Sequence, residues 1–399
     1  MVLKSAIKES VFEQKENLHL AQPGLQRESN ENLQLSPDFI TIITGVRRCG
    51  KSTLLLQLLK NLSKDDYAYF NFEDPRIFGF DVNDFPKLEK VLGNKSYYFF
   101  DEIQNVDKWE LFIRKLHDNG KIICLTGSNA SLLSKELGTR LTGRNLQYEL
   151  FPFSYQEFCD LKNKERSVVS FDDYLDIGGF PLYIKTGNQE YLHQLFRDIL
   201  FRDIIVRYGI RNSKIMEGIA LFLISNVAKE YSLTNIKNTF GVGSTNSISD
   251  YVSWLEDSYL IFTLPRFSWS LKSVAVNPKK IYTIDSGFAQ ANSLSFSSDK
   301  GRLFENAVFI HLRKRKDELF YFKEKGECDF VIKRKNKVIE VVQACYDLND
   351  DNFHQEISGL KEAMDFFNLK KGTLVTRNQT DEWKENEKQI NIVSAEEWF

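Results

Sequence analysis

The sequence lacks paired cysteines, long apolar runs and an excess of charge of one sign, and each absence excludes a class of protein. Its five cysteines are widely spaced and include no CxxC pair, so neither a disulfide framework nor a zinc ribbon is expected. The longest apolar stretch, near residues 218–228, is far shorter than the roughly 20 residues that span a bilayer, and it predicts a buried helix. The formal net charge of -2 argues against a nucleic-acid coat, although it permits a local basic patch.

The residues that are present have the composition of an ordered globular protein. Hydrophobic residues make up 42% and charged residues 27% of the 399 residues, which is ordinary for soluble domains. A chain of this length predicts two or three domains. The first residues carry scattered charges and no apolar run, so we expect no signal peptide. Together with the cysteine usage, this favours a cytoplasmic protein with no membrane partner.

Residues 39–153 alternate short β-rich runs with helical stretches, which is typical of a parallel α/β sheet. The runs are FITIIT, YAYFNF, YYFF, IICLT and LQYELF, and the helical stretches include KSTLLLQLLKNL and WELFIRKLHD. Short all-apolar strands with crossover helices are buried on both faces, and ligands bind beyond the carboxyl ends of such strands. The sequence therefore predicts an α/β domain over residues 1–153, with its site at one edge of the sheet.

Three further segments follow this domain. Residues 154–211 have a helical pattern rich in aromatic and acidic residues, which favours a helical lid or connector. Residues 212–270 predict a helix, a Gly-rich turn and a second helix. Residues 271–399 predict a second α/β domain, in the order strand, helix, three strands, helix and strand.

Residues 45–52 form a complete GxxxxGKS motif between an apolar strand and a helical run, which is the context that a phosphate-binding P-loop requires. The backbone N–H groups of such a loop curl around phosphates, the helix amino terminus adds positive charge, and the lysine reaches the terminal phosphates. The sequence therefore predicts binding of ATP, or a closely similar nucleoside triphosphate, with Ser52 as a Mg²⁺ ligand. The residues assigned to nucleotide binding are Gly45, Val46, Arg47, Arg48, Cys49, Gly50, Lys51, Ser52 and Thr53.

The run YYFFDE at residues 97–102 supplies the acids that phosphoryl transfer needs. An aromatic strand that ends in Asp-Glu has the Walker B form. Asp101 is expected to hold the hydrated Mg²⁺, and Glu102 is expected to polarise the water that attacks the γ-phosphorus. The alternative is a strand end that is capped by acids before a turn.

Three polar residues further along are candidates for the same site. Asn129 follows the next strand, between the P-loop strand and the acid strand, where its side chain can contact the γ-phosphate or the water. Arg140 and Arg144 stand four apart, hence on one face if this segment is helical, and one of them is a candidate arginine finger. Solvated cations at a helix end are the alternative. An arginine finger that acts in trans requires a homo-oligomer.

Several segments in register resemble a large prokaryotic family of AAA-like ATPases with a carboxyl-terminal domain similar to PD-(D/E)XK nucleases. They begin with GVRRCGKST, YYFFDEIQNV, LTGSNASLLSKELGTRLTGR and ELFPFSYQEF. The resemblance continues through YLDIGGFP, YVSWLEDSYLIFTLPRFS, KKIYTIDSGFA, GRLFENAVF and GECDFVI. It implies a P-loop ATPase fold, a winged-helix-like region over residues 212–270 and a nuclease-like α/β domain over residues 271–399. It names no pathway.

Individual residues of the nuclease-like segment depart from the pattern of active nucleases. Glu305, on the helix of GRLFENAVF, and Asp329, on the strand of ECDFVIK, are candidate ligands of a second, weak metal site. In active members of the wider fold, a following strand carries an acid, one spacer and a lysine. Whether Glu340 or Gln343 takes the acid position, the residue two further on is not a lysine. We therefore expect no nuclease activity.

The predicted helix-turn-helix has the wrong charge for reading a DNA groove. Phosphate contacts normally come from Lys and Arg, but residues 244–260 contain neither and carry Asp250, Glu256 and Asp257 instead. This favours a structural or protein-contact role. Taken together, the sequence predicts an AAA-like ATPase that couples ATP binding and hydrolysis to the other domains. The alternative is a nucleotide-gated module that binds DNA or a protein and hydrolyses ATP only incidentally.

Overall fold

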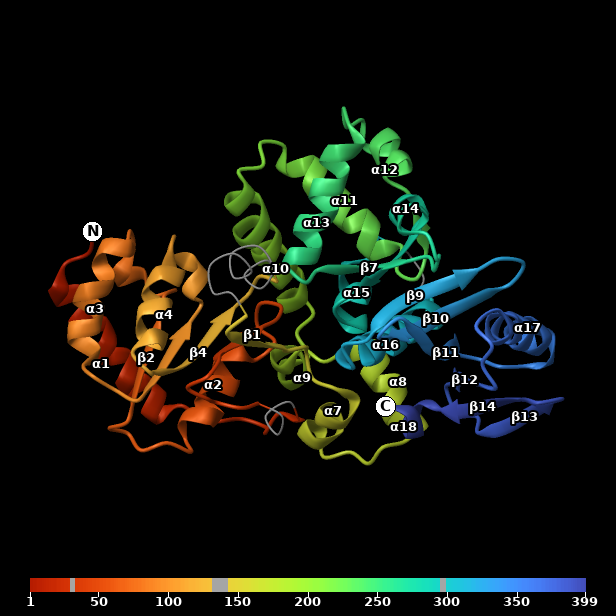
Figure 1. Ribbon diagram of the computed structural model, residues 1–399, viewed down its shortest axis with the longest axis horizontal. Helices are drawn as coiled ribbons and strands as arrows, with labels where there is room; N and C mark the ends of the chain where they lie inside the picture. Colours follow the sequence, from red (N-terminus) through yellow and green to blue (C-terminus); the bar gives the residue numbers. More distant parts are fainter. Residues whose placement is uncertain (29–32, 131–142, 295–298) are drawn as a thin grey trace. The chain divides into compact units, whose positions relative to one another are not determined.

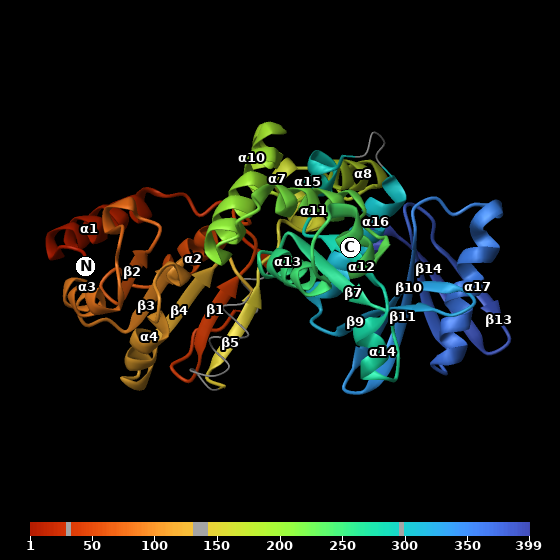
Figure 2. The same ribbon diagram turned by 90° about the horizontal axis from the view of Figure 1, so that it is seen from above.

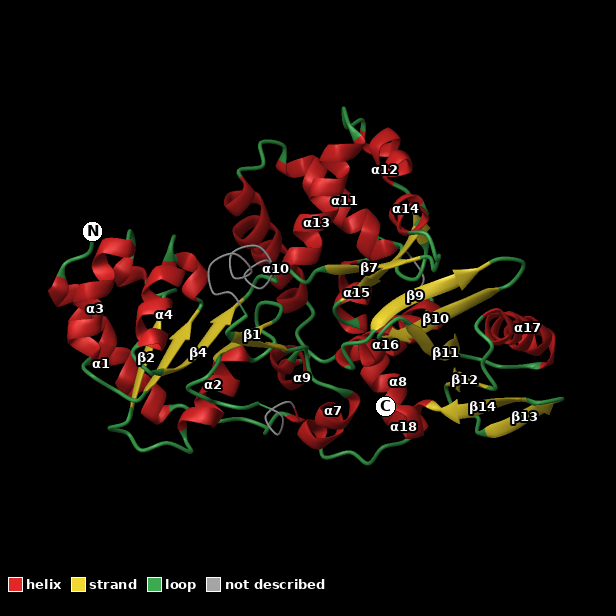
Figure 3. Ribbon diagram, in the orientation of Figure 1, coloured by secondary structure: helices red, strands yellow, loops and turns green. Residues whose placement is uncertain are grey.

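The computed structural model describes residues 1–28, 33–130, 143–294 and 299–399 (Figure 1). The chain divides into two compact units, unit 1 over residues 1–151 and unit 2 over residues 152–399. Each unit combines helices with β-sheet, as the colouring of Figure 3 shows. Among the described residues, every helix is too short or too polar to cross a membrane.

Unit 1 is built on a five-stranded, all-parallel sheet with the order β2-β3-β4-β1-β5. Its strands are β1 (Ile40–Thr44), β2 (Tyr67–Asn71), β3 (Tyr97–Asp101), β4 (Ile122–Gly127) and β5 (Asn145–Glu149). Each of the five β-rich runs of the sequence forms one of these strands, so the predicted parallel α/β sheet is confirmed. Because β4 pairs with β1 on one side and β3 on the other, the loop after β4 emerges between the P-loop strand and the acid strand.

The helices of unit 1 owe their positions to one-sided apolar faces. They are α1 (Lys4–Leu20), α2 (Lys51–Leu59), α3 (Phe85–Leu92) and α4 (Trp109–Asp118). In α4, Trp109, Phe112, Ile113 and Leu116 are buried, which is the helical spacing of a core-facing stripe. They join an aromatic cluster that links α1, α3 and α4 to the sheet, in which the rings of Phe85 and Phe112 stack with centroids 4.3 Å apart.

Unit 2 contains two sheets. A three-stranded sheet has the order β6-β8-β7, and a six-stranded mixed sheet has the order β13-β14-β12-β11-β10-β9. The strands of the first are β6 (Glu230–Tyr231), β7 (Ile261–Pro265) and β8 (Lys279–Thr283). Those of the second are β9 (Glu318–Lys323), β10 (Glu327–Arg334), β11 (Lys337–Cys345), β12 (Lys371–Thr376), β13 (Asp381–Glu385) and β14 (Lys388–Ser394).

Most helices of unit 2 precede its large sheet in the sequence. The first group is α7 (Tyr155–Lys162), α8 (Val168–Ile177), α9 (Pro181–Thr186), α10 (Glu190–Asp198) and the π-helix η5 (Ile199–Val206). The second is α11 (Ser213–Ser225), α12 (Leu233–Phe240), α13 (Thr245–Asp257), α14 (Leu271–Val276) and α15 (Ser286–Asn292). The last three are α16 (Lys300–Lys314), α17 (Asp350–Phe366) and α18 (Ala395–Trp398).

The predicted helix, Gly-rich turn and helix are α12, the turn that begins at Gly241, and α13. Gly241 ends α12 with a φ of 63°, a left-handed conformation that suits glycine. Ile248, Val252 and Leu255 are buried along one face of α13. An antiparallel pair, β7 and β8, follows these helices. The pair joins residues on either side of position 270, where the sequence predicts a boundary between two segments.

The large sheet extends the predicted carboxyl-terminal pattern. The order α16, β9, β10, β11, α17 and β12 reproduces the expected helix, three strands, helix and strand. The strand that the sequence places before them, β8, pairs with β6 and β7 in the other sheet. The hairpin of β13 and β14 adds two strands beyond the expected set. Apolar side chains of α17 pack on this sheet, and Figure 2 shows the helix beside it.

Candidate functional site

The P-loop turns tightly from the end of β1 into the amino terminus of α2. Gly45 has a φ of 154° and Gly50 a φ of 108°, conformations that other residues rarely adopt. A Cβ atom on Gly45 would lie 2.1 Å from the carbonyl oxygen of Leu150, so a larger residue does not fit there. The loop therefore presents its backbone and the positive end of α2 to one place, which is the geometry of an anion site.

Lys51 opens α2 and is only 4% exposed. Its Nζ lies 3.0 Å from the carbonyl oxygen of Gly45, 3.2 Å from that of Val46 and 3.4 Å from Oε1 of Glu102. Burial acts to lower the pKa of Lys51, but nearby negative charge, that of Glu102 above all, outweighs burial and holds the pKa above its ordinary value. The ammonium group is therefore charged and lies inside the loop.

Asp101 is fully buried at the end of β3. Its carboxylate accepts hydrogen bonds from the hydroxyl groups of Thr126 and Tyr69, the Tyr69 bond being 3.2 Å long, and the Ser52 hydroxyl is close enough to act to lower the pKa of Asp101. Burial, and then the charge of Glu102, raise the pKa of Asp101. The two residues that the sequence assigns to Mg²⁺, Ser52 and Asp101, thus lie near each other. Their oxygen atoms fit the ligand preference of Mg²⁺, and its charge would offset the cost of burying the carboxylate.

Glu102 follows Asp101 with a φ of 52°, a left-handed conformation that is strained for a residue other than glycine. Its N–H donates to Oγ1 of Thr126 at 3.0 Å, and its carboxylate accepts a hydrogen bond from Gln104. Burial acts to raise the pKa of Glu102, but Lys51 and Gln104 bring it below its ordinary value. The carboxylate is therefore ionised near neutral pH, as a group that polarises water must be.

Thr126, Gln104 and Tyr69 hold the two acids, and the sequence patterns did not assign them. Thr126 lies in β4, directly beside β3 in the sheet, so the strand order is the signal that points to it. Gln104 also donates to Oγ of Ser128 at 3.2 Å. Asn129, the candidate γ-phosphate contact, follows Ser128 and is buried. It therefore lies next to the hydrogen bonds that orient Glu102.

Other P-loop side chains brace the loop. Nη1 of Arg47 lies 2.8 Å from Oε1 of Glu73. The buried Arg27 donates to the carbonyl oxygens of Cys49 at 2.9 Å and Phe151 at 2.7 Å. Burial raises the pKa of the Cys49 thiol, so this cysteine is an unreactive packing residue. These contacts hold the shape of the loop.

The remaining P-loop positions divide between the inside and the outside of the loop. Val46 is fully buried, and Arg48 has a φ of 66°. Ser52, Thr53 and Asn71 are among the residues that line a pocket of about 820 Å³. This volume is in the range of small-molecule sites.

The two candidate arginine fingers are Arg140 and Arg144. Arg140 lies outside the described residues. Arg144 precedes β5, where its carbonyl oxygen accepts the N–H of Ile40 at 2.9 Å and its guanidinium lies 3.1 Å from Asp118. Ile40 begins β1 and the P-loop follows the other end of this strand, roughly 15 Å away at 3.3 Å per residue. Arg144 therefore does not reach the P-loop of its own chain.

Unit 2 contains a second polar site, the Lys280 cluster, formed by Lys280, Glu305, Glu327 and Asp329. The buried Nζ of Lys280 lies 2.8 Å from Asp329, 2.8 Å from Glu327 and 3.0 Å from Glu305. Burial acts to lower the pKa of Lys280, but the surrounding carboxylates hold it well above its ordinary value. Burial and the charge of Asp329 raise the pKa of Glu305 to about 7.

The Lys280 cluster brings together Glu305 and Asp329, the predicted pair of weak metal ligands, and places an ammonium group between them. In active nucleases of the wider fold the lysine is expected two residues after an acid on the strand that corresponds to β11. Lys280 comes instead from β8, a strand of the other sheet. Across the described ranges, no group of three or more His, Cys, Asp or Glu side chains is arranged to hold a metal ion.

Comparison with solved structures finds several similarities at low identity, each with a TM-score below 0.5. The Walker-type ATPase of Pyrococcus abyssi is 15% identical, with a TM-score of 0.42 over 67% of this chain and 95% of that chain. AMPPCP-bound DnaA from Aquifex aeolicus is 16% identical, with a TM-score of 0.30 over 57% and 85%. The Aeropyrum pernix ORC1 protein in complex with DNA is 12% identical, with a TM-score of 0.29 over 73% and 92%.

Sequence comparison identifies the family. Residues 38–159 match the AAA domain, and residues 168–299 and 300–398 match two domains of unknown function, DUF8612 and DUF4143. An uncharacterised protein of Methanocaldococcus jannaschii is 36% identical over 376 residues, covering 88% of this chain and 84% of that protein. An uncharacterised protein of Haemophilus influenzae is 30% identical over 344 residues, covering 80% and 85%. The chain belongs to the same family as these two proteins, and residues 38–159 form its AAA-type ATPase domain.

Proposed function

We propose that the protein binds ATP with Mg²⁺ at residues 45–53 and hydrolyses it. The observation that carries this proposal is the buried centre of unit 1, where Nζ of Lys51 lies 3.4 Å from Oε1 of Glu102 and the Asp101 carboxylate is held by Thr126 and Tyr69 near Ser52. A phosphate-binding lysine, two oxygen ligands for a cation and an ionised carboxylate are the parts that phosphoryl transfer to water needs. The AAA-domain match over residues 38–159 supports the same function.

The contact between Lys51 and Glu102 gives ATP binding a direct effect on the catalytic carboxylate. In this proposal the loop amides and the amino terminus of α2 hold the phosphates. Lys51 then leaves the carbonyl oxygens of its own loop and Glu102 for the more highly charged phosphates. Glu102 is released to accept a proton from the attacking water. Binding thus prepares the base for hydrolysis.

Ser52 and Asp101 would hold Mg²⁺, which when bound neutralises charge on the phosphate oxygens. Thr126 and Tyr69 keep the Asp101 carboxylate oriented through their hydroxyl groups. We assign Asn129 to the γ-phosphate or the attacking water, because it is the polar residue that follows the strand between β1 and β3.

Lys51→Ala is expected to weaken ATP binding by roughly 100-fold or more, because it removes a charge-assisted contact worth about 1.5–3 kcal/mol per hydrogen bond. Titration of the purified protein with a fluorescent ATP analogue and Mg²⁺ measures this affinity. The matched control is Lys60→Ala, an exposed lysine at the other end of α2, which should bind as the wild type does. Equal affinity in the Lys51→Ala protein would remove the P-loop from the proposal.

The remaining parts of the proposal concern assembly and coupling. An arginine finger, Arg140 or Arg144, would act in trans in a homo-oligomer, since Arg144 lies away from the P-loop of its own chain. The winged-helix-like segment, residues 212–270, would receive the nucleotide signal together with the nuclease-like domain, residues 271–399. The second candidate function is a nucleotide-gated module that grips DNA or a protein and hydrolyses ATP only incidentally. If the rate of ATP turnover is the same with and without DNA or a protein partner, the second candidate is favoured.

Unit 2 is not a nuclease in this proposal. The ammonium group of Lys280 takes the place between Glu305 and Asp329 where a divalent cation would bind. Purified protein with Mg²⁺ or Mn²⁺ is therefore expected to leave supercoiled plasmid intact over hours, as judged by gel electrophoresis. Cleavage that Asp329→Ala abolishes would show that the carboxylates do bind a catalytic metal.

A further inference from the structure

The helix formed by α10 and η5 carries arginines at an unusual spacing. The sequence FRDILFRDIIVRYGIR at residues 196–211 places Arg197, Arg202 and Arg207 five residues apart, and Arg211 follows four residues later. A period of five fits neither the 3.6-residue turn of an α-helix nor the alternation of a strand. Residues 199–206 form a π-helix, whose hydrogen bonds join residues five apart; Arg202 lies in this segment, Arg197 precedes it in α10 and Arg207 directly follows it.

This winding sorts the Arg-Asp pairs onto two faces. The inner face is apolar and buried. Its side chains are Leu192, Leu195, Phe196, Ile199, Leu200, Ile204 and Ile205. Asp203 is buried with them and Asp198 is half-buried, whereas Arg197, Arg202 and Arg207 are all exposed. Each Arg-Asp pair of the sequence is therefore split, with its positive charge outside and its negative charge toward the core.

We call the exposed set Arg197, Arg202, Arg207 and Arg211 the arginine stripe. Within the part of the chain that the structure describes, none of the four forms an ion pair, whereas Arg334 and Arg377 each pair with an aspartate. The apolar side chains of Phe201, 41% exposed, and Val206, 75% exposed, lie along the same stretch of helix. Among the described residues, the stripe is a concentration of positive side chains without ion pairs, on a chain whose net charge is -2.

We propose that the arginine stripe binds the phosphate backbone of a nucleic acid. Guanidinium groups bind phosphate oxygens bidentately, and a regular row of them matches a regular row of phosphates. From Arg197 to Arg207 the stripe extends at most roughly 15 Å at 1.5 Å per residue, a length over which a duplex presents about nine phosphate charges. The exposed Phe201 ring offers a stacking surface to an unpaired base. An acidic protein surface fits less well, because its carboxylates have no such regular spacing.

The proposed nucleic-acid contacts are made by the arginine stripe and not by the helix-turn-helix. Residues 244–260 carry acids and no basic residue, so contact with phosphates there is unfavourable. The arginine stripe lies on a different helix of unit 2, and its chemistry does not involve the P-loop. The proposal is therefore independent of ATP hydrolysis.

The test is fluorescence anisotropy of the full-length protein with labelled single-stranded DNA, RNA of the same sequence and duplex DNA over a salt series. Wild-type affinity is expected to fall as salt rises, with the three probes showing which backbone is preferred. Each lost phosphate contact lowers the slope of log K against log salt by about 0.9 for duplex and about 0.7 for a single strand. The variant R197Q/R202Q/R207Q should therefore lose roughly two to three units of slope and at least ten-fold in affinity at the lowest salt.

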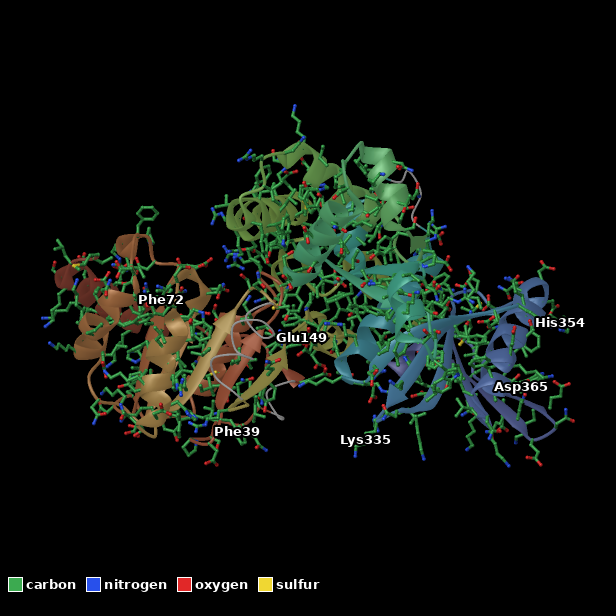
Figure 4. All side chains as sticks on the ribbon, turned by 45° about the horizontal axis from the view of Figure 1, so that its top comes forward. Phe39, Phe72, Glu149, Lys335, His354 and Asp365 are labelled. Carbon is green, nitrogen blue, oxygen red and sulfur yellow. The ribbon has the colours of Figure 1, made fainter. Side chains whose placement is uncertain are left out.

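The matched control is K162Q/K325Q/K335Q, which removes three positive charges from exposed, scattered positions of unit 2. Lys335 projects from the turn between β10 and β11 (Figure 4). This control should keep the wild-type slope, and both variants should keep the melting temperature and basal ATP turnover. The proposal would be overturned by equal losses in both variants or by unchanged binding of the arginine variant. It would also be overturned if the wild type did not bind at the lowest salt, or if it bound polyglutamate as tightly. Binding in the Lys51→Ala background should match wild type, so failure of the ATP site is distinguishable from failure of the stripe.

Discussion

Replacing Glu102 by glutamine is expected to slow ATP hydrolysis by roughly 10²- to 10⁴-fold, the usual contribution of a general base, without loss of ATP binding. An amide has the same shape but does not accept the proton of the attacking water. Glu102 is also the residue that contacts Lys51 at 3.4 Å across the P-loop. Removal of its charge takes away a competitor for the lysine, so the affinity for ATP is expected to stay the same or rise.

Single-turnover phosphate release and titration with a fluorescent ATP analogue measure the chemical step and the affinity separately. Asp107→Asn is the matched control, because it converts another carboxylate of the same loop to an amide at an exposed position. It should leave the rate within about two-fold of wild type, as surface substitutions usually do. Full turnover in the Glu102→Gln protein would assign the base to another residue. Loss of binding in the same protein would contradict the competition between Glu102 and phosphate for Lys51.

The sheet of unit 1 is predictable from sequence because its strands are buried on both faces. ITIIT in β1 is buried at every position, so the strand appears in the sequence as a run of β-branched residues without a charge. The edge strand β13 gives no such signal. Its residues, DEWKE, are exposed except for the tryptophan, which is half-buried, and the strand exists because its hairpin partner β14 pairs with it. Local patterns therefore miss strands whose pairing alone defines them.

The nucleotide site divides in the same way. Lys51 and Ser52 belong to a contiguous motif, and Asp101 and Glu102 end an apolar strand, so sequence alone assigns them to one site. Gln104, which donates a hydrogen bond to Glu102, belongs to no sequence motif. Its contribution comes from the turn after β3, which brings its side-chain amide back to the carboxylate.

Two features of unit 2 are even harder to predict from local sequence patterns. Lys280 lies 49 positions before Asp329 and on a different sheet, so no spacing rule pairs them. The sequence analysis did not single out the arginine stripe, because the exposure of its side chains on one helix depends on which face of that helix is buried. In both cases the arrangement of the charged side chains depends on how the chain folds, and local sequence patterns do not predict it.

Lys280→Met is expected to destabilise unit 2 by roughly 3–5 kcal/mol, because it leaves buried carboxylates without their cation. For a unit of this size, that loss corresponds to a fall in melting temperature of roughly 10 °C. Thermal and urea unfolding of the full-length protein measure it. Lys279→Met, at the half-buried neighbouring position, is the control and should cost less than about 1 kcal/mol.

The carboxylates themselves provide the decisive comparison. If the loss in Lys280→Met comes from uncompensated charge, adding Glu305→Gln and Asp329→Asn should restore much of the stability, since the triple replacement removes the two more buried carboxylate charges of the cluster together with their cation. A triple variant that is less stable still would mean that Lys280 acts through packing instead. Mn²⁺ should stabilise the Lys280→Met protein and leave wild type unchanged, because the space between Glu305 and Asp329 then opens to a divalent cation. Stabilisation of both proteins by Mn²⁺ would contradict the view that the ammonium group of Lys280 stands in place of a metal ion.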